Sequence, residues 1–201
     1  MKSSDIFMIN ASADDIEINR GELALRLGVS RGYDDELIRS CKKKLMDVID
    51  YKCAYIRTDI DLSEENICGF DFMTIDSSAL YKNLAGCSEA FVFAVTTGIG
   101  VDRLLARLNV ISPAEHFVTD ALASAAADSF CGYAAGQLKQ GLVCPPRFSP
   151  GYADLSLRFQ VPLLDRLDAH GLLGITLDSA YLMTPVKSIT AIMGIKNEKN
   201  N

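Results

Sequence analysis

The chain has 201 residues, of which 49% are hydrophobic and 23% are charged. A core of ordinary size fits this length, and we expect one domain that carries a helical extension. Its net charge of −6 argues against nucleic-acid binding, which needs a concentrated basic face. No apolar run approaches the roughly 18 residues of a membrane span, so no membrane contact is expected either.

The first ten residues, MKSSDIFMIN, lack the long apolar segment and the cleavage site of a secretory signal. We therefore expect a cytoplasmic protein. Its cysteines form no C-x-x-C pair and have no histidine nearby in sequence, so neither structural zinc nor a thioredoxin-type motif is indicated. In a reducing compartment they are expected to be buried small hydrophobic residues. They are Cys41, Cys53, Cys68, Cys87, Cys131 and Cys144.

The first half of the chain alternates between helical and strand patterns. Apolar residues at helical spacing, behind an acidic start, predict an amphipathic helix over residues 34–50. Short strands are predicted over residues 54–60 and 69–75, and a helix over residues 77–84. The continuous apolar run over residues 90–95 has the length of a buried strand.

A glycine turn follows this strand, in the segment Thr96-Thr97-Gly98-Ile99-Gly100, and a helix begins near Val101. A strand, a glycine turn and a helix can together hold a phosphate, because backbone N–H groups are unpaired at a helix start. The dinucleotide-binding pattern requires a third glycine, however, and Arg103 takes its place. An incomplete pattern of this kind is weak support for a nucleotide site.

The segment Ser112-Pro113-Ala114-Glu115 matches a capping box with proline at the first helical position, which predicts a helix start. The helix can run to about Lys139, where Gly141 can end it. Its middle, residues 121–136, is rich in alanine, serine and glycine, so the backbone of another element can approach closely. We expect this to be the central helix of the domain.

Helical spacing aligns His116, Asp120, Ser124 and Asp128 on one face of this helix. The row is not a hydrolase triad, because His116 and Ser124 lie about 12 Å apart at 1.5 Å per residue. A metal site has suitable spacing at His116 and Asp120, but no third ligand is visible in the sequence. We favour a polar stripe that faces a cavity or bonds to loops. Carboxylates that face a pocket can meet a cationic ligand.

The segment RFSPGY, at positions 147–152, follows Cys144-Pro145-Pro146 and brings three of the chain's six prolines within six residues. Proline fixes φ, and glycine opens conformations that other residues avoid, which together hold a loop in one shape. Such a loop either has a structural role as a turn in the fold or binds a ligand.

The last part of the chain predicts one helix and one strand. Residues 155–167 have helical period, Gly171 is expected to end that helix, and His170 in its last turn is expected to cap it. Residues 188–195 alternate apolar and polar side chains, as a strand with one buried face does. Strands separated by helices without regular β-α-β spacing indicate an α+β domain with a mixed or antiparallel sheet.

Three stretches share features with one known family: Thr97-Gly98-Ile99-Gly100-Val101-Asp102; Arg147-Phe-Ser-Pro-Gly-Tyr-Ala-Asp-Leu-Ser-Leu157 with Gln160; and Thr184-Pro-Val-Lys-Ser-Ile-Thr-Ala191 with Gly194. They resemble the activation domain of cobalamin-dependent methionine synthase, in the form found as a separate small protein. The likeness runs from about Gly21 to Ile195. It implies a C-shaped α+β fold with a twisted antiparallel sheet and a long central helix. We place this domain at residues 51–201, behind an N-terminal helical extension, residues 1–50, that packs on it.

In the full-length synthase this domain binds S-adenosylmethionine, docks over the cobalamin domain, and lets an inactive cob(II)alamin be reduced and remethylated. The resemblance implies a stand-alone reactivation component that acts on a cobalamin-binding methionine synthase or another corrinoid protein. A flavodoxin- or ferredoxin-type protein would be the reductant. Methyl transfer and redox chemistry belong to the cofactors, so the chain needs no catalytic residue of its own.

The resemblance also assigns ligand-binding roles, mostly to the loop. Arg147 carries a planar fork of donors that suits a carboxylate, Gly151 lets backbone groups approach the ligand, and Tyr152 adds a flat apolar face. Asp128 is the best-placed acid for the ligand's sulfonium, and Ser124 aligns with an acidic residue of the synthase. The competing interpretation is that Arg147 anchors the loop and Tyr152 fills a corner. The candidate residues are Ser124, Asp128, Arg147, Phe148, Ser149, Gly151 and Tyr152.

Two departures from the family leave a second function open. No residue near the start of the domain matches the ligand-binding acid of the synthase, and no tyrosine-bearing segment follows Gly194 to close over the ligand. The alternative is therefore a non-enzymatic module that docks on a corrinoid protein, or a small-molecule-binding protein, without S-adenosylmethionine binding.

Overall fold

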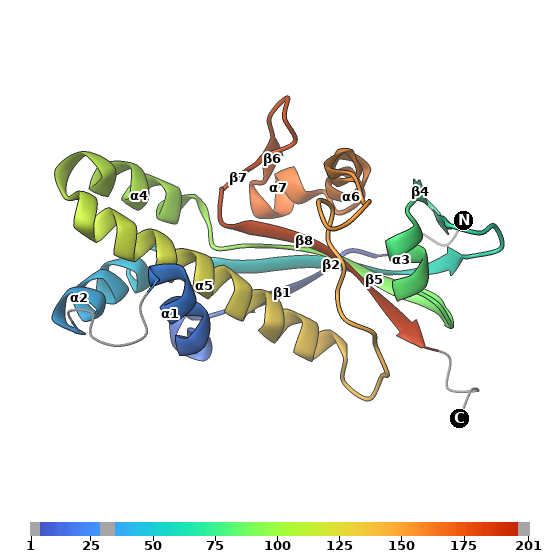
Figure 1. Ribbon diagram of the computed structural model, residues 1–201, viewed down its shortest axis with the longest axis horizontal. Helices are drawn as coiled ribbons and strands as arrows, with labels where there is room; N and C mark the ends of the chain where they lie inside the picture. The colour runs from blue at the N-terminus through green and yellow to red at the C-terminus, as the bar shows by residue number, and fades with distance from the viewer. Residues whose placement is uncertain (1–4, 29–34, 197–201) are drawn as a thin grey trace.

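A long, curled antiparallel sheet runs through the molecule and carries helices on both faces (Figure 1). The computed structural model describes residues 5–28 and 35–196. Within these residues the main sheet has six strands, ordered β4-β3-β2-β5-β8, with β1 also paired to β2. They are β1 (Phe7–Ala11), β2 (Tyr51–Asp61), β3 (Ile67–Phe70), β4 (Thr74–Asp76), β5 (Cys87–Thr96) and β8 (Ser188–Lys196). A small separate hairpin pairs β6 (Thr176–Leu177) with β7 (Met183–Thr184).

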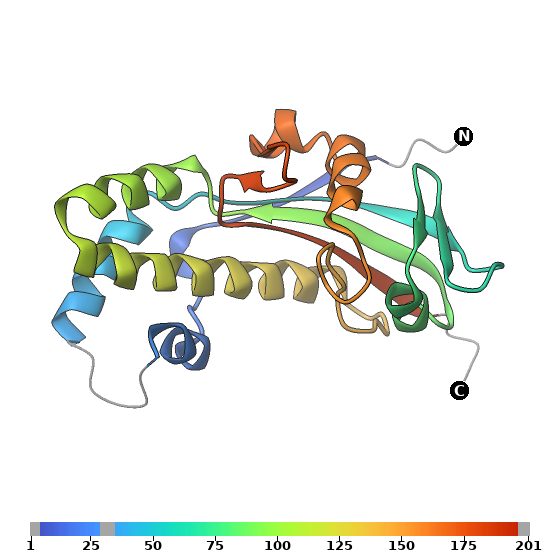
Figure 2. The same cartoon turned by 45° about the horizontal axis from the view of Figure 1, so that its top comes forward.

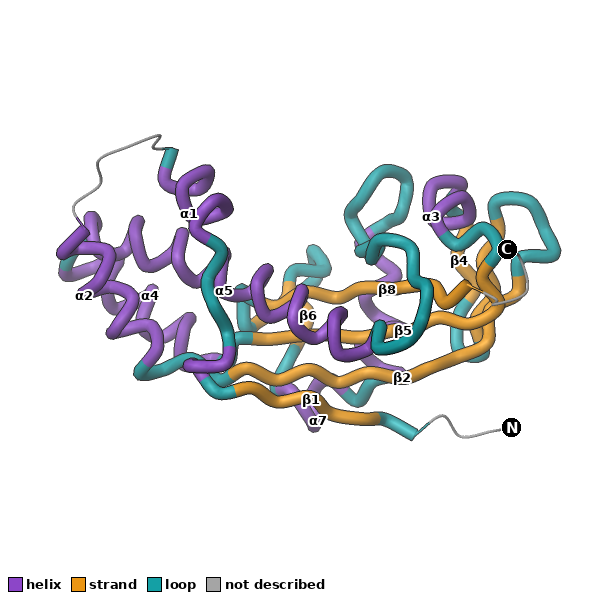
Figure 3. Tube along the Cα trace, turned by 90° about the horizontal axis from the view of Figure 1, so that it is seen from below, coloured by secondary structure: helices purple, strands orange, loops and turns teal. Residues whose placement is uncertain are grey.

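β2 is the long strand to which both halves of the sheet attach (Figure 3). Its residues 52–59 pair with β5 along one edge. Along the other edge β1 pairs with residues 51–55, and β3 follows at Ile60 and Asp61. The N-terminal segment therefore contributes a strand to the sheet, which the sequence analysis did not predict. The division of the chain at residue 50 stays a prediction.

Both faces of β5 are buried, which explains its continuous apolar sequence. Successive side chains of a strand point to opposite faces. Phe91 and Phe93 contact one core, and Val92 and Ala94 contact the other. The first core is covered by α1 (Arg20–Leu27), α2 (Asp35–Met46), α4 (Ile99–Ile111) and α5 (Pro113–Leu138), and the second by α3 (Ser78–Asn83), α6 (Gln160–Arg166) and α7 (Ala169–Leu173) (Figure 2).

The long helix α5 lies along the first face of the sheet (Figures 1 and 2), as predicted. Its buried alanines, Ala121 and Ala125 among them, let neighbouring elements approach its backbone. The predicted capping box does not form, because the Ser112 side chain makes no cap hydrogen bond. Glu115, which would complete the box, instead pairs with Lys44 at 2.7 Å and joins α5 to α2.

Two predicted elements are divided in the structure. Residues 69–75 form β3 and β4 rather than one strand, because the chain turns back and pairs Cys68 with Ile75. The helix predicted over residues 155–167 begins later, as a 3-10 turn at Leu157–Phe159 followed by α6.

Two helix ends also differ from the prediction. His170 and Gly171 lie in the separate helix α7, which ends at Gly174 with φ +67°, so neither residue caps α6. The helix predicted over residues 34–50 is α2, which ends at Met46; position 34 lies outside the described residues.

β8 is buried on both faces, although its sequence predicted one exposed face. Ser188 and Thr190 are only 8% and 3% exposed. Ser188 Oγ lies 2.7 Å from the carbonyl of Pro185 and 2.9 Å from Thr96 Oγ1. Hydrogen bonding lets this polar side chain be buried without the cost of an unpaired group.

The six cysteines are free thiols, and all but Cys144 are buried, as predicted. Burial raises the pKa of Cys68 and of Cys131 to about 11, so both thiols are neutral near pH 7. In the part of the chain that the structure describes, no helix has the length and apolar character of a membrane span.

Candidate functional site

The three stretches that carry the family resemblance meet around β8. The backbone N–H of Thr97 donates to the Lys187 carbonyl at 3.1 Å, and that of Val186 donates to Asp102 Oδ2 at 2.9 Å. Phe148 and Ile192 exchange two backbone hydrogen bonds of 2.8 Å each. The glycine turn is therefore bonded to the segment just before β8, and the proline-rich loop is bonded to the middle of the same strand.

The glycine turn serves close packing. Gly98 has φ +83°, and a Cβ there would lie 2.9 Å from Asp50 Cβ. A Cβ on Gly100 would lie 2.5 Å from the Val48 carbonyl oxygen. Both glycines let the start of α4 approach the segment before β2, which accounts for them without a bound phosphate.

The proline-rich loop has a fixed shape at the surface. Pro150 is buried, and Gly151 adopts φ +95°, which a side chain would strain. The backbone N–H of Gly151 donates to the Leu155 carbonyl at 2.7 Å, and that of Tyr152 donates to the Ser149 carbonyl at 3.1 Å. Tyr152 itself is 63% exposed, so the rigid turn presents an aromatic ring to solvent.

Asp154 ties the far end of this loop to α3. Its carboxylate accepts hydrogen bonds from Ser77 Oγ at 2.5 Å and from the Ser78 backbone N–H at 2.8 Å. These hydrogen bonds, that of Ser77 above all, lower the pKa of Asp154 to about 2. The loop is thus held at β8 by Phe148 and at α3 by Asp154.

A pocket of about 330 Å³ opens beside the loop, between β8, α5 and α6. This volume lies at the lower end of the ~300–1,000 Å³ typical of ligand sites. Five predicted site residues meet there: Asp128, Arg147, Ser149, Gly151 and Tyr152. Pro150, Leu157, Gln160, Met183, Ser188, Ile189 and Thr190 complete the lining.

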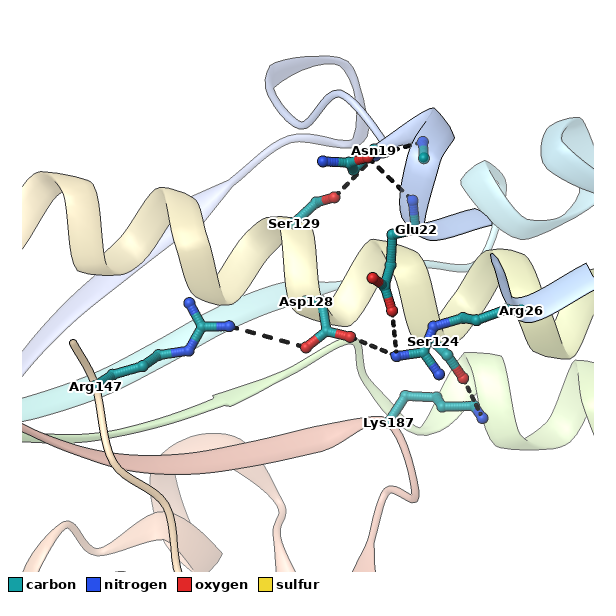
Figure 4. A network of polar contacts seen from close by, with 9 residues as sticks. Asn19, Glu22, Arg26, Ser124, Asp128, Ser129, Arg147 and Lys187 are labelled. Carbon is teal, nitrogen blue, oxygen red and sulfur yellow. Dashed lines mark hydrogen bonds and ion pairs between the residues drawn. The ribbon is translucent and has the colours of Figure 1, made fainter. Parts of the chain in front are cut away.

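Asp128 lies between two arginines (Figure 4). Its Oδ2 accepts from Arg26 Nη2 at 2.6 Å, and its Oδ1 lies 3.9 Å from Arg147 Nη2. The second distance is longer than a hydrogen bond, so Asp128 does not saturate the Arg147 donors. Arg26 also pairs with Glu22 at 2.9 Å.

Ser124 and Phe148 do not line the pocket. Ser124 Oγ lies 2.8 Å from Lys187 Nζ, which also pairs with Asp120 at 2.7 Å. Phe148 packs against the second core and contacts the Tyr152 ring, with 6.2 Å between centroids. As direct ligand contacts, all seven candidate residues stay predictions. Three residues of the polar stripe on α5 behave as expected: Asp120 and Ser124 bond to Lys187 in the segment before β8, and Asp128 reaches a cavity.

Two site features escaped the sequence analysis. Arg26 comes from a helix that was not predicted, and nothing in its local sequence indicates a partner 102 residues away. Gln160 was seen in a motif but given no role. It is 4% exposed, its Nε2 donates to the Tyr181 carbonyl at 3.2 Å, and its buried Oε1 has no hydrogen-bond partner in the described structure.

A second hollow of about 500 Å³ adjoins the first. Arg147 and Tyr152 line both, and Lys139, Cys144 and Pro146 belong to the second alone. Arg147 and Tyr152 therefore separate the two hollows, of which the first is lined by Asp128 and the second by Lys139.

The fold and the pocket together define a C-shaped α+β domain with a ligand-sized hollow beside a rigid loop. A solved structure of the MetH reactivation domain bound to AdoHcy has a similar fold, with a TM-score of 0.77 and 12% sequence identity over 98% of this chain and 80% of that chain. The resemblance seen in the sequence is thereby confirmed as a likeness of fold, including the antiparallel sheet and the long helix. No protein-family model and no curated protein matches the chain.

Proposed function

We propose that this chain is a stand-alone reactivation component that binds S-adenosylmethionine and acts on a cobalamin-carrying methionine synthase or a related corrinoid methyltransferase. The observation that carries the proposal is the pocket beside the Arg147–Tyr152 turn. It lies in a fold similar, over 98% of the chain, to a domain solved with AdoHcy bound.

The lining suits an amino-acid nucleoside. Arg147 offers a donor fork for a carboxylate, and its side chain is 35% exposed. Ser149 and Thr190 add hydroxyl groups for a ribose or an amine, and the exposed Tyr152 ring offers a face for a base. Because the loop is already fixed by Asp154 and by the Phe148–Ile192 pair, little ordering free energy is lost on binding.

The chemistry of reactivation belongs to the ligand and to the partner. S-adenosylmethionine supplies the methyl group, and the partner carries cob(II)alamin, which takes one electron from a flavodoxin- or ferredoxin-type reductant. This chain would hold the methyl donor over the corrinoid and exclude water. Such a role requires a binding site and a docking surface but no nucleophile or general base.

A docking module without S-adenosylmethionine binding is the second candidate. The observation that favours it is that both acidic residues of the stripe on α5 already form ion pairs within this chain. Asp128 pairs with Arg26, and Asp120 pairs with Lys187. Each carboxylate already has a cation, which reduces the attraction left for a sulfonium.

Two measurements separate the candidates. Calorimetric titration of the wild-type chain with S-adenosylmethionine should give a saturable heat; its absence, with AdoHcy also inert, favours the docking module. The chain is then mixed with a cob(II)alamin-loaded methionine synthase that lacks its own reactivation domain, a reductant and S-adenosylmethionine. Conversion of the absorbance spectrum to that of methylcobalamin supports the proposal, and an unchanged spectrum with a competent partner refutes it.

A further inference from the structure

The helix α1 is held on α5 at both of its ends, and one of these contacts is to the pocket-lining Asp128 (Figure 4). At its start, the backbone N–H of Asn19 donates to Ser129 Oγ at 3.1 Å. The Asn19 side chain accepts from the backbone N–H groups of Gly21 and Glu22 at 2.9 and 3.1 Å and so caps the helix. At its end, Arg26 reaches Asp128, the residue next to Ser129. These contacts fix the position of α1 on α5 and thereby hold the Arg26 guanidinium next to Asp128.

Four charges alternate along this contact: Glu22, Arg26, Asp128 and Arg147. Asp128 is the one acidic residue among the described pocket-lining residues, and each of its oxygens has an arginine as its nearest cation. The Arg26 contact is the shorter by far, 2.6 Å against 3.9 Å. Arg26 thus neutralises the carboxylate that the pocket would otherwise offer to a cation.

We propose that Arg26 sets the selectivity of the pocket, so that it holds the uncharged thioether AdoHcy about as tightly as the sulfonium S-adenosylmethionine. This inference rests on the proposed function. The two ligands share the nucleoside and the amino-acid portion, and they differ in one methyl group and one positive charge. A pocket distinguishes them through the charge that it presents near the sulfur, and with Arg26 in place that charge is balanced.

A consequence concerns product release. A pocket with an unpaired carboxylate would hold the methyl donor more tightly than the demethylated product. A balanced pocket retains the product as well, so methyl transfer alone does not expel it, and exchange for a new donor depends on the concentrations of the two ligands.

The test compares dissociation constants for both ligands by calorimetry at low and high salt. In the wild type and in Arg26→Lys, which keeps the charge, the two constants should agree within about twofold. In Arg26→Gln the preference for S-adenosylmethionine should rise about two- to fivefold, the range of partly exposed ion pairs, and should shrink at high salt. Asp128→Asn supplies a second test with the opposite sign, because it removes the carboxylate that Arg26 and Arg147 share and should shift the preference toward the uncharged AdoHcy.

The outcomes are distinct. If both ligands bind and Arg26→Gln leaves their ratio unchanged, the inference is refuted while the proposed function stands. A wild type that strongly prefers S-adenosylmethionine and loses the preference in Asp128→Asn also refutes it, since Asp128 would then be an active sulfonium partner. Failure of the wild type to bind either ligand overturns the proposed function and this inference together.

Discussion

The packing role of the glycine turn is tested by adding a single methyl group. Gly100 is the second residue of α4, and a Cβ there would lie 2.5 Å from the Val48 carbonyl oxygen, about 1 Å inside an ordinary contact. The Val48–Asp50 backbone cannot yield freely, because the Asp50 N–H donates to the Thr97 carbonyl at 2.9 Å. Overpacking of this kind costs about 1–3 kcal/mol, against a helix-propensity gain below about 1 kcal/mol. We expect Gly100→Ala to lose about 1–2 kcal/mol.

Gly132→Ala is the matched control. Gly132 lies within α5, and a Cβ there would meet nothing within 4 Å. The same substitution should therefore stabilise the protein by up to about 1 kcal/mol. In thermal unfolding followed by circular dichroism, we expect a midpoint about 2–8 °C lower for Gly100→Ala and about 2–4 °C higher for Gly132→Ala. A Gly100→Ala protein as stable as the wild type would refute the packing explanation and reopen a ligand role for the turn.

Three further predictions concern the loop and the thiols. Arg147→Ala should weaken S-adenosylmethionine binding about 10- to 100-fold in calorimetry, because a charge-assisted hydrogen bond to the ligand carboxylate contributes ~1.5–3 kcal/mol. The control Arg107→Ala, at an exposed position on α4, should bind the ligand like the wild type. A loss of affinity below twofold in Arg147→Ala would contradict the role assigned to Arg147. Since hydrogen bonds lower the pKa of Asp154 to about 2, its contribution to stability is complete above pH ~4 and is lost as the pH falls toward 2. Urea unfolding at several pH values should therefore show Asp154→Asn to be less stable than wild type at pH 6 and nearly equal to it near pH 2, and a constant difference would argue against this linkage. Under native conditions a thiol reagent such as DTNB should modify at most Cys144, and all six cysteines only after unfolding; rapid reaction of two or more native thiols would contradict the observed burial.

The sequence predicted the elements whose patterns are local. The run of apolar residues in β5 marks a strand buried on both faces, and Pro113 marks the start of α5. Where a residue distant in the sequence determines the burial or the partner of a side chain, the local pattern gave a wrong prediction. Ser188 and Thr190 look like an exposed strand face, yet both are buried, and Ser188 bonds to Thr96, 92 residues away in the sequence. Glu115 looks like part of a capping box, yet Lys44 of α2 takes its carboxylate.

The site was predictable where rigidity shows in the residue types. Proline and glycine mark the turn around Arg147, and five of the seven candidate residues meet at one pocket. The helical row on α5 also correctly placed Asp128 on the face that reaches the cavity. The row could not reveal which charge Asp128 would meet, since Arg26 lies 102 residues away on a helix with no strong sequence signal.

The segment before residue 50 bears on both the fold and the chemistry. β1 pairs with β2 through Phe7–Ala11, and α1 brings Arg26 to Asp128. A boundary at residue 50 would separate β1 from the strand it pairs with and Arg26 from the carboxylate it neutralises. The pocket is built from the loop, β8, α5 and α6, but its charge is completed by α1. The ion pairs around this site therefore depend on the N-terminal segment as well: a pocket assembled without it would lack both Arg26 and Glu22, and Asp128 would keep only the 3.9 Å contact with Arg147 among these pairs.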